Sequence, residues 1–207
     1  MSNAYAIAAT TAALRYLVTP ALRIVPGAQV ATVRPDHLGK ENLTRGVNIY
    51  LYRVSPNPDF RNLDLPTRDA SGALQQTPVV ALDLNYILTF FGDDSQLEPQ
   101  RLLGATVSAL HENPFLTPEL IRAAAASASD LGVARQDLSE QEPRVQLYPK
   151  ALTLHDLHQI WSTFYQVPYS LSVAYEASVV LIEGTRTERL VGTVDEVHVH
   201  ADTEVAP

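Results

Sequence analysis

The stretch Val80-Ala81-Leu82-Asp83-Leu84-Asn85-Tyr86-Ile87-Leu88-Thr89-Phe90 decides the fold of this chain. Every second residue from Val80 to Phe90 is apolar, and polar residues stand between several of them. Because side chains alternate between the two faces of a β-strand, the pattern predicts a long strand at the centre of a sheet. We expect its apolar face to hold Val80, Leu82, Leu84, Tyr86, Leu88 and Phe90, and its second face to hold Asp83, Asn85 and Thr89.

Other segments repeat this alternation and are predicted to be further strands. Residues 47–52 place aliphatic side chains on one face and amide and aromatic side chains on the other. Shorter strands are expected at residues 29–33 and around residues 145–149. The last clear strand is predicted to place Val173, Tyr175, Ala177, Val179 and Leu181 on one face, and Ser172, Glu176 and Ser178 on the other.

Four segments are predicted to be helices, because their apolar residues recur at helical spacing and helix-starting or helix-stopping residues flank them. They cover residues 3–18, 99–113, 117–126 and 153–167. Thr117 and Thr153 are the expected N-caps of the last two helices, since a hydroxyl can accept from a free backbone N–H there. The buried stripe of the last helix is predicted to be Leu154, Leu157, Ile160, Trp161 and Phe164.

These elements predict an α+β fold, with a mixed, mainly antiparallel β-sheet and helices packed on one side. The 207 residues fit one domain, residues 1–185, followed by a C-terminal tail, residues 186–207. Residues 190–200 of the tail alternate weakly, and neither face is apolar enough to demand burial in the chain's own core. We therefore expect this extended strand to pair with another molecule. Residues 55–78 are rich in proline and are predicted to form a long loop.

Composition argues against several classes of function. Asp and Glu total 23 against 15 Lys and Arg, and the chain shows no concentrated basic patch, which disfavours binding to nucleic acid. There is no cysteine, so neither disulfides nor a thiolate metal site are expected. No run approaches the ~18 apolar residues that a bilayer-crossing helix requires. The apolar N-terminal stretch lacks the basic start of a secretion signal, and we expect it to remain as a helix.

Histidines offer the most suggestive candidates for a metal site. His155 and His158 lie three residues apart on a predicted helix and share a face, and Asp156 lies between them. His198 and His200 would share one face of a strand. No third and fourth ligands are evident for either pair, so we interpret Asp156 as a helix-capping acid and the histidines as solvated side chains.

The acidic residues Asp83, Asp93 and Asp94 are candidates for acid–base chemistry, and a structural interpretation is preferred for each. Asp93 and Asp94 follow Gly92 and are interpreted as turn residues that end the central strand. Asp83 is interpreted as a buried or interfacial acid with satisfied hydrogen bonds. The sequence also lacks a phosphate-binding glycine loop, a nucleophile elbow and a His-Glu-x-x-His zinc motif. We therefore predict no catalytic residue, no metal ligand and no cofactor.

Several segments, taken in order, resemble one protein family. They are Val47-Asn48-Ile49-Tyr50-Leu51-Tyr52-Arg53-Val54 with Pro56-Asn57 and Arg61-Asn62, Leu82-Asp83-Leu84-Asn85-Tyr86-Ile87-Leu88-Thr89 with Phe91-Gly92, Leu102-Leu103-Gly104 with Leu110-His111, and Trp161-Ser162 with Ser172-Val173-Ala174-Tyr175-Glu176. Together they resemble the N-terminal domain of the cap, or tail-terminator, proteins of extracellular contractile injection systems. These are the relatives of the Photorhabdus virulence cassette and the antifeeding prophage, and the similarity extends from about residue 4 to residue 182.

This resemblance implies a tail-terminator-like fold and a structural role without enzymatic activity. Members of the family form a ring of six subunits on the baseplate-distal end of the tube and sheath, and the ring stops their polymerisation. The implied partners are further copies of this chain, the sheath protein, the inner tube protein and sister cap proteins, with no nucleic acid and no membrane span. Assembly is expected in the cytoplasm of a bacterial producer. Some relatives have another C-terminal domain that helps to close the channel, and we expect this chain to lack it.

Interface residues are predicted in the tail strand and in the proline-rich loop. They are Val191, Thr193, Val194, Val197 and Val199 in the strand, and Asn57, Arg61 and Arg68 in the loop. Two alternatives stay open at this point. One is the tail terminator of a contractile bacteriophage, and the other is a small metal-dependent enzyme that uses His155 and His158.

Overall fold

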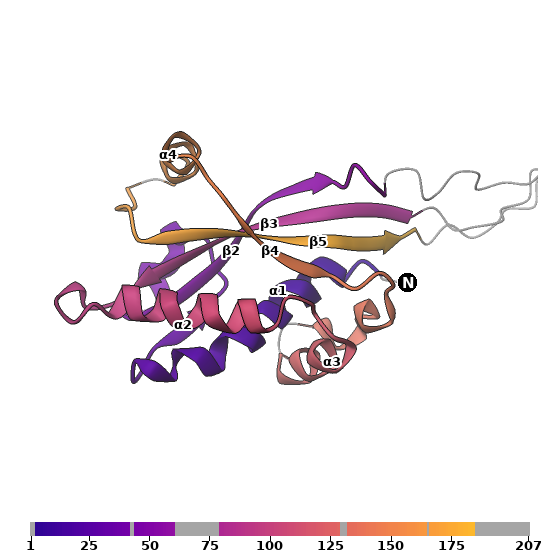
Figure 1. Ribbon diagram of the computed structural model, residues 1–207, viewed down its shortest axis with the longest axis horizontal. Helices are drawn as coiled ribbons and strands as arrows, with labels where there is room; N and C mark the ends of the chain where they lie inside the picture. The colour runs from indigo at the N-terminus through magenta and orange to yellow at the C-terminus, as the bar shows by residue number, and fades with distance from the viewer. Residues whose placement is uncertain (1–2, 42–43, 61–78, 129–131, 165, 185–207) are drawn as a thin grey trace, which may run out of the picture.

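The computed structural model describes residues 3–41, 44–60, 79–128, 132–164 and 166–184 (Figure 1). Within these residues the strands form one five-stranded sheet in the order β1-β2-β3-β5-β4. Strand β1 runs parallel to β2, and every other neighbouring pair is antiparallel. The predicted α+β fold with a mixed, mainly antiparallel sheet and a long central strand is therefore confirmed. The strands are β1 (Gln29–Ala31), β2 (Gly46–Pro56), β3 (Val79–Phe91), β4 (Gln146–Lys150) and β5 (Ser172–Glu183).

Helices α1, α2 and α3 cover one face of the sheet, and α4 stands over the other face (Figure 1). One-sided packing therefore describes the first three helices but not α4. The helices are α1 (Ala6–Val18), α2 (Glu98–Glu112), α3 (Pro118–Ser127) and α4 (Leu154–Ser162), and the 3-10 helix η1 (Thr19–Ile24) continues α1. The predicted N-caps are confirmed, because the Thr117 hydroxyl accepts from the backbone N–H of Leu120 and the Thr153 hydroxyl accepts from that of Asp156.

The core lies between β3 and the covering helices. Leu84, Tyr86, Leu88 and Phe90 are each at most 1% exposed and pack with buried residues of α1 and α2. Burying each such side chain contributes roughly 1.5–3 kcal/mol to folding. The Tyr86 hydroxyl shares a hydrogen bond with Thr11 Oγ1 (2.9 Å), so its polar end is satisfied, and burial raises the pKa of Tyr86.

A β-bulge reverses the predicted alternation in β5. Leu84 pairs with Ala177 but Leu82 pairs with Val180, so Ser178 and Val179 both lie opposite Asp83. Beyond the bulge, β5 turns Val180 toward the core under the helices, whereas Val179 and Leu181 pack with Ala81 in a separate cluster. The prediction that Val179 and Leu181 share a face with Ala177 is wrong, because one extra residue exchanges the two faces.

The limits of the core and of β1 also differ from the prediction. Val80 was expected in the core but is 55% exposed, near the end of β3 that extends past the helices (Figure 1). The strand expected at residues 29–33 ends at Ala31. Past that point the side-chain amide of Asn48 takes over the pairing: its Oδ1 accepts from Val33 N (3.1 Å) and its Nδ2 donates to Val33 O (2.9 Å).

Gly46 is required where β1 meets β2. Its φ is +148°, and a Cβ added there would lie 2.0 Å from the carbonyl oxygen of Gln29. We expect Gly46→Ala to lower the free energy of unfolding by more than about 1 kcal/mol, because both the backbone angle and the contact with β1 resist a side chain. Urea unfolding followed by circular dichroism measures this change.

Gly104 in α2 provides the matched control, since a Cβ added there meets nothing within 4 Å. Gly104→Ala is expected to raise stability by about 0.5–1 kcal/mol through helix propensity. If both variants raise stability, the close approach of β1 to Gly46 does not constrain the fold.

Candidate interaction surfaces

The face of the sheet opposite α1, α2 and α3 carries a row of polar side chains. Cross-strand pairing aligns Arg53 of β2 with Asn85 of β3, Asn85 with Glu176 of β5, and Glu176 with Tyr148 of β4. Residues paired in this way place their side chains on the same face. Charged and aromatic side chains together on the part of this face beside α4 form a surface suited to protein contact rather than to a core.

Lys150 at the end of β4 bonds to two residues of this row. Its ammonium group donates to Asn85 Oδ1 (2.6 Å) and to the carboxylate of Glu176. Tyr52 lies close enough to respond to these charges: burial raises its pKa, and the nearby Lys150 opposes that shift. Because Glu176 is paired with Lys150, this cluster is suited to holding strands in place rather than to transferring protons.

A second polar cluster anchors the segment that follows β2. Asp83 is 8% exposed, and its Oδ1 accepts from Asn57 Nδ2 (2.8 Å) and from the Ser178 hydroxyl (2.7 Å). Asn57 Oδ1 accepts in turn from the backbone N–H groups of Asp59 and Phe60 (3.0 Å each). Asp83 is thus a buried acid with satisfied hydrogen bonds, as interpreted from the sequence.

The predicted interface residues fall into two groups. Asn57 is 5% exposed, and its side-chain amide is committed to bonds within the chain. Any contact that it makes with a partner must therefore act through the segment it anchors. The other predicted interface residues, Arg61, Arg68, Val191, Thr193, Val194, Val197 and Val199, lie outside the described residues.

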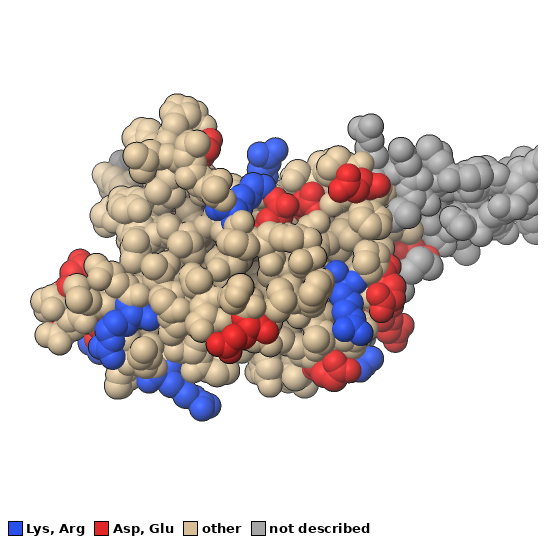
Figure 2. Space-filling view, in the orientation of Figure 1, with Lys and Arg blue, Asp and Glu red and all other residues tan. Residues whose placement is uncertain are grey.

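Helix α4 is attached to the sheet at its C-terminal end. Phe164 meets Tyr50 of β2 edge to face (ring centroids 5.7 Å apart), and Trp161 meets both Phe164 (5.9 Å) and Tyr169 (5.5 Å). Such aromatic pairs contribute about 0.5–1.5 kcal/mol each beyond the area they bury. Figure 2 shows α4 projecting from the body of the molecule, with basic and acidic side chains gathered on the surface beside it.

The predicted buried stripe of α4 is correct only at this end. Trp161 and Phe164 are each 7% exposed, whereas Leu154 is 86% exposed, and Leu157 and Ile160 are half-buried. Helical spacing identified the apolar side, but it could not show that the first turn of α4 overhangs the sheet. An overhanging apolar side chain next to charged residues adds to the contact surface on this side of the molecule.

The histidines of α4 do not converge on a metal site. His155 and His158 are both exposed, and His155 Nε2 lies 2.9 Å from Gln159 Nε2. Asp156 completes a capping box with Thr153, and hydrogen bonds from the Thr153 hydroxyl and backbone lower its pKa. Among the described residues there is no group of three or more side chains that could hold a metal ion. His198 and His200 lie outside the described residues.

An ion pair next to the turn after β3 was not predicted from the sequence. Asp93 Oδ1 accepts from the backbone N–H of Ser95 (2.8 Å) and from its hydroxyl (2.7 Å), and these bonds lower the pKa of Asp93. Glu98, only 7% exposed, pairs with Arg45 (3.1 Å) and accepts from the backbone N–H of Asp93. Arg45 is distant in sequence, so only the fold could identify this pair.

No helix in the described part of the chain combines the length and apolar character needed to cross a membrane. The surfaces found in this part are the polar sheet face, the overhanging helix α4 and the edges of the sheet.

Comparison with known proteins identifies one family model, described as the Pvc16 N-terminal domain, which matches residues 9–195. One similar solved structure is titled as a PVC sheath/tube terminator of an extracellular contractile injection system in its extended state. Its TM-score is 0.52 at 16% identity, and the match covers 89% of this chain and 63% of that chain. A second is titled as the anti-feeding prophage cap, the AFP tube terminating cap. It has a TM-score of 0.51 at 16% identity and coverage of 84% and 54%.

The chain thus spans less than two thirds of the length of either solved chain. At 16% identity these likenesses establish a shared fold. The search of curated proteins found no match.

The Asp83 cluster can be tested by removing its acceptor. Asp83→Ala leaves the amide of Asn57 and the hydroxyl of Ser178 without their shared partner, and we expect a loss of about 1–3 kcal/mol in the free energy of unfolding. Asp83→Asn keeps an oxygen at the same position and is expected to lose less. Urea unfolding of both variants measures the difference, and equal losses would show that hydrogen bonding at this oxygen contributes little.

Proposed function

The chain belongs to the Pvc16 N-terminal domain family, and on this premise we propose that it is a structural cap of a contractile injection particle. In this proposal six copies form a ring on the baseplate-distal end of the tube and sheath and stop their polymerisation. The partners are other copies of this chain, the sheath protein, the inner tube protein and sister cap proteins. Assembly takes place in the cytoplasm of a bacterial producer.

The observation that carries the proposal is the match of the family model to residues 9–195, most of the chain. The two solved structures that share its fold have titles that describe a sheath/tube terminator and a tube terminating cap. The surface of the described residues is consistent with such a role. Its most distinctive features, the polar sheet face and the overhanging helix α4, are suited to contact with other proteins.

The metal-dependent alternative is not supported, because His155 and His158 are exposed and no third ligand approaches them within the described residues.

The proposed cap acts by completing unpaired strand edges. A growing sheath or tube presents free backbone N–H and C=O groups at its end, and a terminator must bond them without offering the same edge onward. We assign this pairing to the tail strand, with Val191, Thr193, Val194, Val197 and Val199 as its contact residues. Residues 1–185 then act as the ring-forming domain, and residues 186–207 act as the connecting tail.

The loop after β2 is proposed as a second contact, with the tube or with the neighbouring subunit. Asn57 anchors the start of this loop to Asp83 and Ser178, and the segment that follows contains Arg61 and Arg68. A loop projecting from a rigid sheet can specialise for binding without disturbing the core.

Truncation after Glu188 tests the role of the tail. We expect the truncated chain to fold, because the described core lies within residues 3–184, and to lose its capping activity. Circular dichroism and thermal unfolding check the fold. Electron micrographs of particles from producer cells that carry only the truncated gene measure tube and sheath length, which should become irregular.

Deleting the whole gene provides the control for this experiment. If the deletion disturbs particle length and the truncation does not, the cap function stands and the assignment of the tail strand is wrong. If particles keep their normal length without the gene, the chain is not a terminator.

A further inference from the structure

The two edges of the sheet differ in their capacity to accept another strand. At the β4 edge, Leu147 N donates to Pro114 O (2.7 Å) and Val145 O accepts from Leu116 N (2.9 Å), so this part of the edge is already covered. Alternation turns the nitrogen of Pro149 toward the same outer side, and proline has no N–H to donate. The β4 edge is therefore closed to strand addition.

The β1 edge is open. Gln29 N donates to Arg45 O (3.2 Å), and Gln29 and Ala31 pair with β2. Successive residues of a strand turn their backbone groups to opposite sides, so the N–H and C=O groups of Val30 and Thr32 point away from the sheet. In the described part of the chain no other segment bonds to these groups.

A hollow lies next to this edge. It has a volume of about 300 Å³ and is lined by Ala8, Thr11, Ala12 and Arg15 of α1, by Thr32 beyond β1, and by Val133. Most of these side chains are small, so another backbone can approach α1 closely.

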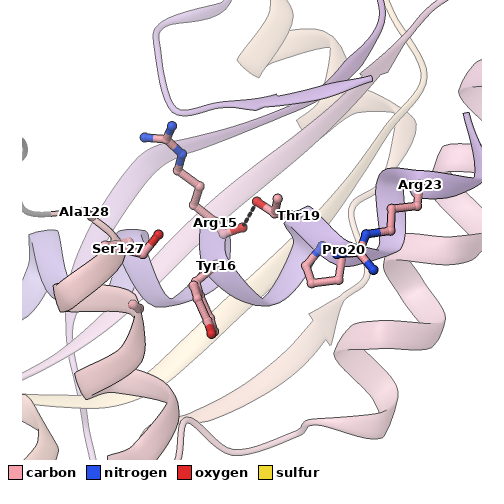
Figure 3. A pocket seen from close by; sticks show the side chains of 9 residues that line it. Arg15, Tyr16, Thr19, Pro20, Arg23, Ser127 and Ala128 are labelled. Atoms are coloured by element: carbon pink, nitrogen blue, oxygen red, sulfur yellow. Dashed lines mark hydrogen bonds between the residues drawn. The ribbon is translucent and has the colours of Figure 1, made fainter. Parts of the chain in front are cut away.

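Arg15 supplies a positive charge to the hollow. Its guanidinium makes no ion pair with any described residue, whereas its backbone carbonyl accepts from the Thr19 hydroxyl (2.7 Å). Arg15 also lines an adjoining hollow of about 460 Å³ on the α3 side of α1. Figure 3 shows the Arg15 guanidinium directed away from Arg23. Two arginines and no acidic residue line that second hollow, so this flank of α1 is electropositive.

We propose that the β1 edge receives residues 190–200 of a second copy of this chain, with Arg15 paired to Asp195 or Glu196. The inference rests on the proposed cap function and names the acceptor of the tail strand. Residues 190–207 carry four acidic side chains and no lysine or arginine, which complements the charge around Arg15. The outward groups of Val30 and Thr32 supply the backbone hydrogen bonds of β-strand addition.

A second copy is a better donor of the strand than the same chain. In the sheet order, β5 is separated from β1 by β3 and β2, which is about 14 Å across the sheet. Glu183 also lies opposite Val79, whereas β1 lies at the Phe91 end of β3, so the chain's own tail would have to cross the sheet and return along its length. A tail that enters the next subunit instead makes a head-to-tail contact, and such contacts form a ring when the rotation between subunits closes.

Cysteine cross-linking tests this proposal, and the natural absence of cysteine keeps the experiment free of background. Full-length Thr32→Cys is mixed with full-length variants that carry one cysteine at each position from 191 to 199, under mild oxidation. We expect disulfide-linked dimers whose yield alternates along the tail with a period of two, because alternate residues of a paired strand face the same side. Ser108→Cys on the exposed side of α2 replaces Thr32→Cys as the control and should give no alternation.

Two changes test the contacts that hold the strand. Arg15→Glu is expected to lower the cross-link yield about tenfold, and Asp195→Lys with Glu196→Lys in the partner copy is expected to restore it. Val30→Pro removes an outward N–H of the edge and should also reduce the yield. If Val30→Pro fails to fold, Val194→Pro in the tail tests the same pairing without altering the described domain.

Three results would overturn the inference. The first is a yield that does not alternate along the tail. The second concerns a chain that carries both cysteines. If it forms a disulfide within one monomer, while mixtures of single-cysteine chains do not cross-link, the strand that occupies β1 is the chain's own tail. The third is the absence of any cross-link while truncation after Glu188 still abolishes capping. In that case the tail pairs with the sheath or tube, and the cap function stands without this contact.

Discussion

Backbone pairing of β3 on both of its sides is the constraint on which the rest of the structure depends. Strands β2 and β5 flank it along most of its length, so its N–H and C=O groups are satisfied inside the sheet. Its side chains must then divide between the face under α1, α2 and α3 and the face beside α4. A slip of one residue would place Asp83 and Asn85 among the core residues of the helices, and neither has a partner there. The register of the sheet is therefore strongly specified, and the helices can pack only on the side where Leu84 and Leu88 emerge.

The β5 bulge lets one strand contribute both to the core and to the Asp83 cluster on the opposite face. Up to Ala177, β5 contributes to the core below the helices, and the extra residue then brings Ser178 within hydrogen-bond distance of Asp83. That contact holds Asn57, which fixes the chain as it leaves β2. A buried carboxylate is costly unless its oxygens are paired, so the cluster specifies the local geometry as well as stabilising it.

The sequence predicted those features that depend on local order. The long strand β3 and the N-caps Thr117 and Thr153 follow from residues close together in the chain, and all three are present. The wrong predictions depend on residues far apart in the chain. The bulge that turns Val179 away from the core requires the pairing with β3. The exposure of Leu154 follows from where α4 lies over the sheet. For the candidate surfaces, Asn57 was predicted to be an interface residue, but its burial against Asp83 was not predicted, since they meet only across the sheet. The ion pair of Glu98 could not be predicted, because its partner Arg45 is remote in sequence.

The unequal edges of the sheet bear on how a polymer can be ended. A subunit with two open edges would pair on both and extend the assembly without limit, while a subunit with none could not attach by strand addition. Here β4 is closed by Pro149 and by the segment at Leu116, and β1 leaves a short outward edge at Val30 and Thr32. So few backbone bonds give a weak contact in an isolated pair, but a closed ring repeats the contact in every subunit. In the proposed assembly, this short edge therefore favours a complete ring over irregular aggregates.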